Sequence, residues 1–98
     1  MKNDMNIIKT RIKQVVLAKG SSLCIADFLK PELEVLIKNA NLKCEDRRLA
    51  VLYFLEGKRM NDVMEANKWY SSNTFTRHKK SVIAELLTTA RLIAERDY

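Results

Sequence analysis

The chain has 98 residues, of which 47% are hydrophobic and 31% are charged, and its formal net charge is +6. A chain of this length forms one domain at most, residues 1–98, and its composition excludes a disordered protein. Two glycines and one proline are too few for an all-β domain, which needs turn residues about every 8–12 positions. We therefore expect an all-α fold, whose positive charge favours a polyanionic partner such as nucleic acid.

Several classes of function are disfavoured by the residues that carry chemistry. The cysteines, Cys24 and Cys44, form no CxxC pair and lie far from the lone His78, so the sequence predicts no metal site. There is no glycine-rich phosphate loop and no clustered acid–base set, so we expect neither an enzyme nor a cofactor. Reduced thiols and a basic N-terminus without a continuous apolar run indicate a cytoplasmic protein with no signal peptide and no membrane partner.

The first part of the chain, residues 1–20, is a basic arm or helix. Its apolar residues could share one helical face, although their β-branched content leaves a short strand or a mobile arm open: these are Ile8, Ile12, Val15 and Val16. Residues 23–41 then repeat apolar side chains at steps of three and four. Pro31 interrupts that run, so we expect a short turn to about Leu29 and a helix from Pro31 onward.

Three further helices are expected in the second half of the chain. Residues 45–56 begin with two acidic side chains, which suit a helix N-terminus, and Gly57 ends that helix as its cap. Residues 59–67 form a short helix, and the sequence KWYSS makes a turn. A long helix over about 72–94 follows, with one apolar stripe: Phe75, Val82, Leu86, Ala90 and Ile93.

This order of helices is the outline of a helix-turn-helix over residues 45–95. If Phe75 points inward, a turn of about 100° per residue directs Asn73, Arg77 and Lys80 away from the core, with Thr76 on the shoulder of that face. Arginine and asparagine make bidentate contacts with bases, and lysine mainly supplies charge toward phosphates. The serines before the helix cap it, and Ser72 stands where free N–H groups and the positive end of the helix dipole could meet a phosphate.

Simpler interpretations of the same residues remain open. A capped amphipathic helix with a charged face is often only a solvated surface helix. His78 falls near the edge of the buried stripe, so a packed or half-exposed side chain is favoured over a ligand. Trp69 could be a stacking platform for a base, but a turn tryptophan that anchors the domain is the better interpretation.

The stretch from Leu49 to Ala94 resembles the PapB-type adhesin-biosynthesis regulators, small bacterial proteins that control fimbrial operons. The resemblance rests on YFLEGKRMNDV, where an acid–valine pair follows the glycine by five and six residues, on a polar turn with an aromatic, and on the ending TARLIA. It covers about half the chain, residues 45–95. The chain departs from the family in having Arg59 where Ser or Thr commonly caps the short helix, and in a turn that is one residue longer.

The resemblance implies a nucleoid-associated transcriptional regulator, an activator or repressor, that binds repeated AT-rich promoter DNA as a homodimer or higher oligomer. Carried over by position, Asn73, Thr76, Arg77 and Lys80 match its reading helix, and Arg59 and Asn61 match positions that face phosphates. Basic side chains of this kind suit a narrow, electronegative minor groove as well as guanine edges.

Self-association also has support from the residues themselves, because Leu87 and Leu92 lie outside the stripe headed by Phe75. Exposed apolar residues there, or on residues 5–18, suggest a partner surface. Residues 5–41 could instead fold back and cover these leucines within one chain. For the function as a whole, the alternative is a helical adaptor that binds RNA polymerase or another regulator without touching DNA. Its basic face would then be a docking patch for an acidic protein.

Overall fold

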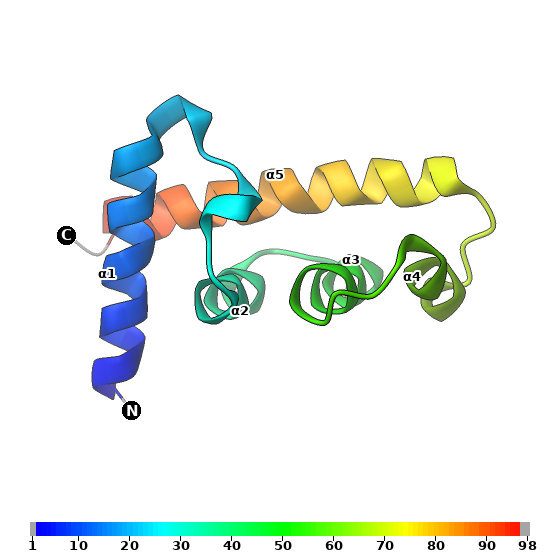
Figure 1. Ribbon diagram of the computed structural model, residues 1–98, viewed down its shortest axis with the longest axis horizontal. Helices are drawn as coiled ribbons and strands as arrows, with labels where there is room; N and C mark the ends of the chain where they lie inside the picture. Colours follow the sequence, from blue (N-terminus) through cyan, green and yellow to red (C-terminus); the bar gives the residue numbers. More distant parts are fainter. Residues whose placement is uncertain (1, 97–98) are drawn as a thin grey trace. The chain divides into compact units, whose positions relative to one another are not determined.

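The computed structural model describes the backbone of residues 2–96 and the side chains of residues 6–96. Within this range every regular element is a helix, so the expected all-α class is confirmed (Figure 1). Packing divides the chain into two compact units. One comprises the residues up to Ala40 together with those from Leu86 onward, and the other comprises Asn41–Glu85. The expectation of a single domain over residues 1–98 stays a prediction.

The first unit begins with helix α1, Lys2–Lys19, which settles the open choice between helix, strand and arm. Its predicted inner face is present, since Ile12 and Val16 are buried and Ile8 and Val15 are half-buried. Helix α2, Lys30–Asn39, packs against α1. The apolar core of this unit comprises Ile12, Val16, Leu23, Phe28, Leu33, Val35, Leu36, Ile37, Ala40, Leu86 and Ala90.

Helix α2 starts one residue earlier than Pro31, the predicted first residue. Pro31 lies in the first turn, where its missing N–H removes no intrahelical bond. Leu29 is the residue just before the helix, and its N–H donates to Oε1 of Glu32 at 3.0 Å. The carboxylate of Glu32 therefore supplies the cap that no serine or threonine provides at this position.

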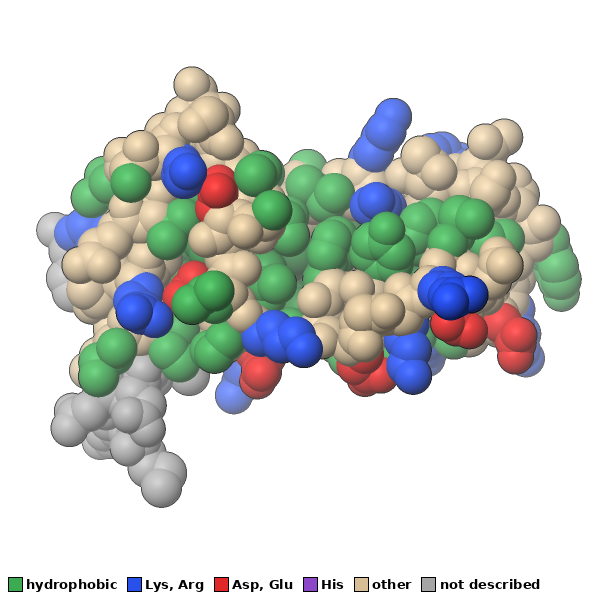
Figure 2. Space-filling view, in the orientation of Figure 1, with side chains coloured by type: hydrophobic (Ala, Val, Ile, Leu, Met, Phe, Trp, Pro, Cys, Tyr) green, Lys and Arg blue, Asp and Glu red, His purple; other side chains and the backbone are tan. Residues whose placement is uncertain are grey.

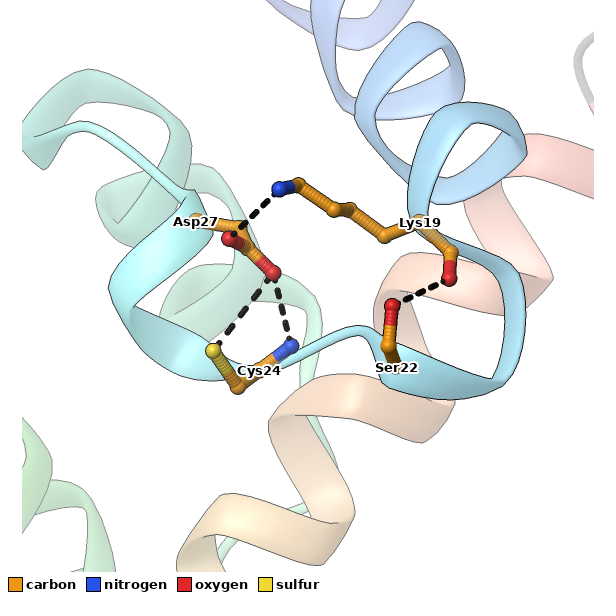
Figure 3. A network of polar contacts seen from close by, with 4 residues as sticks. All are labelled: Lys19, Ser22, Cys24 and Asp27. Carbon is orange, nitrogen blue, oxygen red and sulfur yellow. Dashed lines mark hydrogen bonds and ion pairs between the residues drawn. The ribbon is translucent and has the colours of Figure 1, made fainter.

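The two short 3₁₀ turns between α1 and α2, Gly20–Ser22 and Ile25–Asp27, are held by a small polar network (Figure 3). Oδ2 of Asp27 accepts the N–H of Cys24 at 2.9 Å and lies 3.5 Å from its Sγ. Oδ1 of Asp27 lies 3.6 Å from Nζ of Lys19. The Cys24 N–H chiefly, and the Lys19 ammonium in addition, hold the pKa of Asp27 below its usual value against the opposing effect of burial.

The second unit contains α3, Cys44–Leu49, a π-helical segment η3, Ala50–Leu55, helix α4, Met60–Asn67, and the first part of α5, Ser72–Arg96. The sequence predicted one continuous α-helix over 45–56, and the structure instead widens it after Leu49. The N–H of Glu56 returns to the carbonyl of Val51 at 3.0 Å, five residues back. Residues 50–55 are all apolar or aromatic, so their hydrophobic pattern does not distinguish a π-helix from an α-helix.

The turn before α4 and the turn after it each contain one residue with a left-handed backbone conformation. Gly57 has φ +69° just after η3, as predicted for a helix-ending glycine, and the next N–H, of Lys58, donates to the carbonyl of Leu52 at 2.9 Å. Lys68 has φ 57° just after α4, and the N–H of Trp69 returns to Met64 at 2.8 Å. A left-handed residue here lets the chain reverse, and glycine takes that conformation without a Cβ penalty.

These two positions predict opposite effects on stability. Gly57→Ala is expected to lower the free energy of unfolding by about 1 kcal/mol, because a Cβ there meets no atom within 4 Å and only backbone strain acts. Lys68→Gly is expected to raise it by a few tenths to about 1 kcal/mol for the converse reason. Urea unfolding followed by circular dichroism measures both, and equal shifts in the same direction would contradict the backbone explanation.

The Asp27 network predicts a pH-dependent contribution to stability. Because its folded pKa lies below the unfolded value of about 3.9, the stabilisation is present above that value and is lost as pH falls through the folded pKa. We expect Asp27→Asn to be less stable than the parent at pH 6 and the difference to shrink below about pH 4. A difference that stays constant between pH 6 and pH 2.5 would show that the carboxylate charge contributes nothing.

Candidate nucleic-acid interface

Helix α5 buries the stripe that the sequence predicted. Phe75 and Val82 are buried in the second unit, and Leu86 and Ala90 are buried in the first. Ile93 at the end of the stripe is half-buried. Since side chains on a helix turn by about 100° per residue, burial of Phe75 and Val82 directs the opposite side of the same turns outward.

All seven residues predicted to contact DNA are exposed. Arg59 and Asn61 belong to the start of α4, and the other five lie on the first turns of α5: Ser72, Asn73, Thr76, Arg77 and Lys80. They are therefore available to a ligand, and their contact with DNA stays a prediction.

The start of α5 carries the expected serine cap, and the structure identifies the serine that provides it. Ser71 is the capping residue, because its Oγ accepts the N–H of Asn73 at 3.1 Å and its carbonyl accepts the N–H of Thr74 at 3.1 Å. Ser72 is the first helical residue, with an exposed side chain. The cap therefore occupies one of the N–H groups that the sequence left for a phosphate, and the Ser72 hydroxyl is the polar group that remains outward.

His78 fixes α5 and the turn before it to the rest of the second unit. Its Nδ1 lies 2.6 Å from Oδ1 of Asp46 on α3. Its ring stacks on Trp69, with centroids 4.4 Å apart and planes 24° apart. The expected packed, half-buried histidine is thus found, and both Trp69 and His78 are half-buried, as expected for an anchor.

Lys79 also points inward, since it is half-buried and its Nζ lies 3.3 Å from the hydroxyl of Tyr53 and 4.8 Å from the centre of that ring. The same tyrosine ring packs edge-on against Phe75 at 5.3 Å. Of the three bases on the first turns of α5, Lys79 is therefore used within the fold. Arg77 and Lys80 are the two that face solvent.

Helix α4 is held by polar contacts at both ends. The carboxylate of Asp62 accepts the N–H of Arg59 at 3.2 Å, which replaces the Ser or Thr cap that this chain lacks. At the other end, Oδ1 of Asn67 accepts from Arg48 at 2.7 Å and its Nδ2 donates to the carbonyl of Glu45 at 3.1 Å. Arg59 keeps its side chain in solvent because the acid caps the helix from inside its first turn.

The sequence interpretation missed three exposed residues beside α4: Lys58, Lys68 and Tyr70. Tyr70 is 96% exposed, in the turn that leads to α5. Part of the signal was available in the sequence, because Lys58 adjoins the predicted Arg59 and the other two lie in the turn before α5, but all three were taken only as parts of connecting turns. Lysine and tyrosine side chains are common phosphate contacts, so they extend the candidate set.

The charge along the first half of α5 has one sign. Between Ser72 and Ala84 there is no acidic residue, and Glu85 is the first. Figure 2 shows that elsewhere basic and acidic side chains are interleaved on the face drawn. A helical segment with two exposed bases and no acid lacks the local repulsion that an acidic side chain would exert on a phosphate backbone.

Other kinds of site find no support among the residues that the structure describes. Over this part of the chain no group of three or more His, Cys, Asp and Glu side chains could hold a metal ion. Likewise, no helix within the described range is long and apolar enough to cross a bilayer.

Comparisons of the chain with protein-family models, with curated proteins and with solved structures each found no match.

The His78 contacts predict a loss of stability that an exposed neighbour does not share. His78→Ala removes both the bond to Asp46 and the stack on Trp69, and we expect the free energy of unfolding to fall by about 1–3 kcal/mol. Thr76→Ala, two residues away and exposed, should change it by less than about 0.5 kcal/mol. Urea unfolding followed by the fluorescence of the single tryptophan reports both, and equal effects of the two variants would contradict the anchoring role.

Proposed function

We propose that the protein is a DNA-binding transcriptional regulator that binds duplex DNA through a helix-turn-helix formed by α4 and α5. The observation that carries the proposal is the outward face of the first turns of α5, where Asn73, Thr76, Arg77 and Lys80 are all exposed on a segment without acidic residues. The four-residue turn between Asn67 and Ser72 and the short preceding helix are consistent with that motif.

Each exposed side chain on this face has a definite use against DNA. Arg77 and Asn73 carry the paired groups that bind guanine and adenine edges, and Arg77 also suits a narrow AT-rich minor groove. Lys80 and the Ser72 hydroxyl supply phosphate contacts, which fix register without reading sequence. The resemblance to PapB-type regulators favours AT-rich promoter DNA of fimbrial operons as the target.

Helix α4 and its flanking turns would add contacts on the phosphate backbone. Arg59 and Asn61 lie on its first turn, and the exposed Lys58, Lys68 and Tyr70 lie on either side of it. Backbone contacts of this kind orient a reading helix in its groove and contribute most of the salt dependence of binding.

Binding to repeated sites would require more than one copy of the chain. A symmetric dimer places its two reading helices about one DNA turn, ~34 Å, apart, and that spacing would appear in the period of the protected sites.

The central test removes both exposed bases of the reading face. Arg77→Ala with Lys80→Ala should weaken binding to an AT-rich duplex, with Arg77→Ala alone accounting for about 1–3 kcal/mol, while the helical circular dichroism is retained. Lys80→Ala alone should reduce the slope of log affinity against log salt by about one. Gel retardation at several salt concentrations, with AT-rich and GC-rich duplexes of equal length, measures affinity, slope and preference.

The matched control is Lys30→Ala with Lys38→Ala, two exposed lysines of α2 in the first unit. This control changes the net charge by the same amount. If only Arg77→Ala with Lys80→Ala loses affinity for DNA, the loss comes from the reading face and not from a weaker general attraction between protein and DNA. Equal losses for the two double variants would contradict the assignment of α5. Absence of any retardation by the parent protein, even at low salt, would favour the adaptor that binds an acidic protein instead.

A further inference from the structure

Helix α1 carries apolar side chains on two sides, and the core uses only one of these sides. Ile12 and Val16 are buried against the first unit. On the far side, an arc of about 120° at 100° per residue collects six exposed side chains: Ile7, Thr10, Arg11, Gln14, Leu17 and Ala18. Arg11 is the single charge in that arc, although α1 as a whole is basic.

The apolar members of this arc are unusually open to solvent. Leu17 is 70% exposed and Ile7 is 57% exposed. Figure 2 shows hydrophobic side chains at the surface in the region where Figure 1 places α1. Isolated apolar residues on a surface need no explanation, but several on one helix face indicate a contact surface.

The surface continues onto the start of α2. Leu29 is 58% exposed and lines a hollow with Ile7, Ile8 and Pro31. A second hollow brings Leu29 together with Gln14 and Val15 of α1. The exposed Leu29 therefore forms part of the wall of two hollows, so this surface offers both an apolar side chain and hollows that the same side chain of a second copy could fill.

The charges of this surface are also complementary to themselves. Arg11 and Glu32 line both hollows, and Asp27 lines the second one. A twofold interface puts the same patch on both copies, so a charge in the patch can meet its opposite only if the patch holds both signs. A DNA surface would instead gather bases, as the first turns of α5 do.

We propose that the outer face of α1, with Leu29, binds a second copy of this chain, with the two α1 helices antiparallel across a twofold axis between residues 12 and 13. In that register Ile7 of each copy lies beside Ala18 and Leu17 of the other copy. It sets Arg11 opposite Gln14, whose amide oxygen can accept from the guanidinium, so the two arginines do not lie directly opposite each other. The inference deepens the proposed function, which calls for more than one copy on repeated sites, but its test uses no DNA.

The leucines that the sequence singled out for self-association lie on α5, and they serve as the comparison. Leu87 is half-buried, and Leu92 is 44% exposed in the same unit as α1. Sedimentation equilibrium of the full chain over a range of concentrations should show a reversible dimer for the parent. Ile7→Glu with Leu17→Glu should raise the dimer dissociation constant by at least about tenfold, since it places four acids in the interface, with helical content retained because both side chains are exposed.

Leu92→Glu is the matched control and should leave the dimer unchanged. A parent chain that is monomeric at all concentrations, or dissociation by Leu92→Glu but not by the α1 variant, would overturn the proposal. Arg77→Ala with Lys80→Ala should stay dimeric, so a failure of the dimer and a failure of the DNA-binding proposal are distinguished by separate variants.

A cysteine experiment tests the register. In a Cys24→Ser, Cys44→Ser background, Ile7→Cys with Ala18→Cys should form a covalent dimer on mild oxidation. Within one helix these positions lie about 16 Å apart, too far for an intramolecular disulfide. Ile7→Cys alone should not crosslink in the antiparallel arrangement, and a covalent dimer from that single variant would show a parallel pair and contradict the register.

Discussion

Burial of one stripe on α5 is the constraint on which the rest of the structure depends. Phe75 and Val82 anchor the helix in the second unit, and Leu86 and Ala90 belong to the core of the first. Large apolar side chains each contribute about 1.5–3 kcal/mol when fully buried, so rotation of the helix about its axis would forfeit several such terms together. The outward direction of Arg77 and Lys80 therefore follows from packing that those two residues take no part in.

Polar contacts then determine which basic and aromatic side chains of this region stay available. His78 is tied to Asp46 and stacked on Trp69, and Lys79 is tied to Tyr53. The side chains of His78 and Lys79, which face the core side of α5, are therefore engaged within the fold. Arg77 and Lys80 take part in none of these contacts, and their side chains stay exposed.

The two units present surfaces of different character. The outward face of α5 in the second unit is polar and basic, as a phosphate-rich partner requires. Three of the six exposed side chains on the outer face of α1 are apolar and one is basic, and acidic residues line one of the adjoining hollows. The proposed DNA binding and the proposed self-association therefore rest on separate residues, so that each can be tested by variants that leave the other surface unchanged.

The sequence alone determined the helical class, the order of the helices, the stripe on α5 and, through its period, the exposure of Asn73, Arg77 and Lys80, because these follow from local propensity and helix geometry. Only the tertiary structure showed which residues far apart in the sequence are in contact. Asp46 meets His78 across 32 residues and Tyr53 meets Lys79 across 26, and such partners are chosen by packing between helices. The π-helical winding of η3 differs from the expected α-helix by one residue in the spacing of its hydrogen bonds, a difference to which hydrophobic periodicity is insensitive. Residues 5–18 were named from the sequence only as one possible place for exposed apolar residues, and the packing of α2 against α1 showed which side of that helix the core uses.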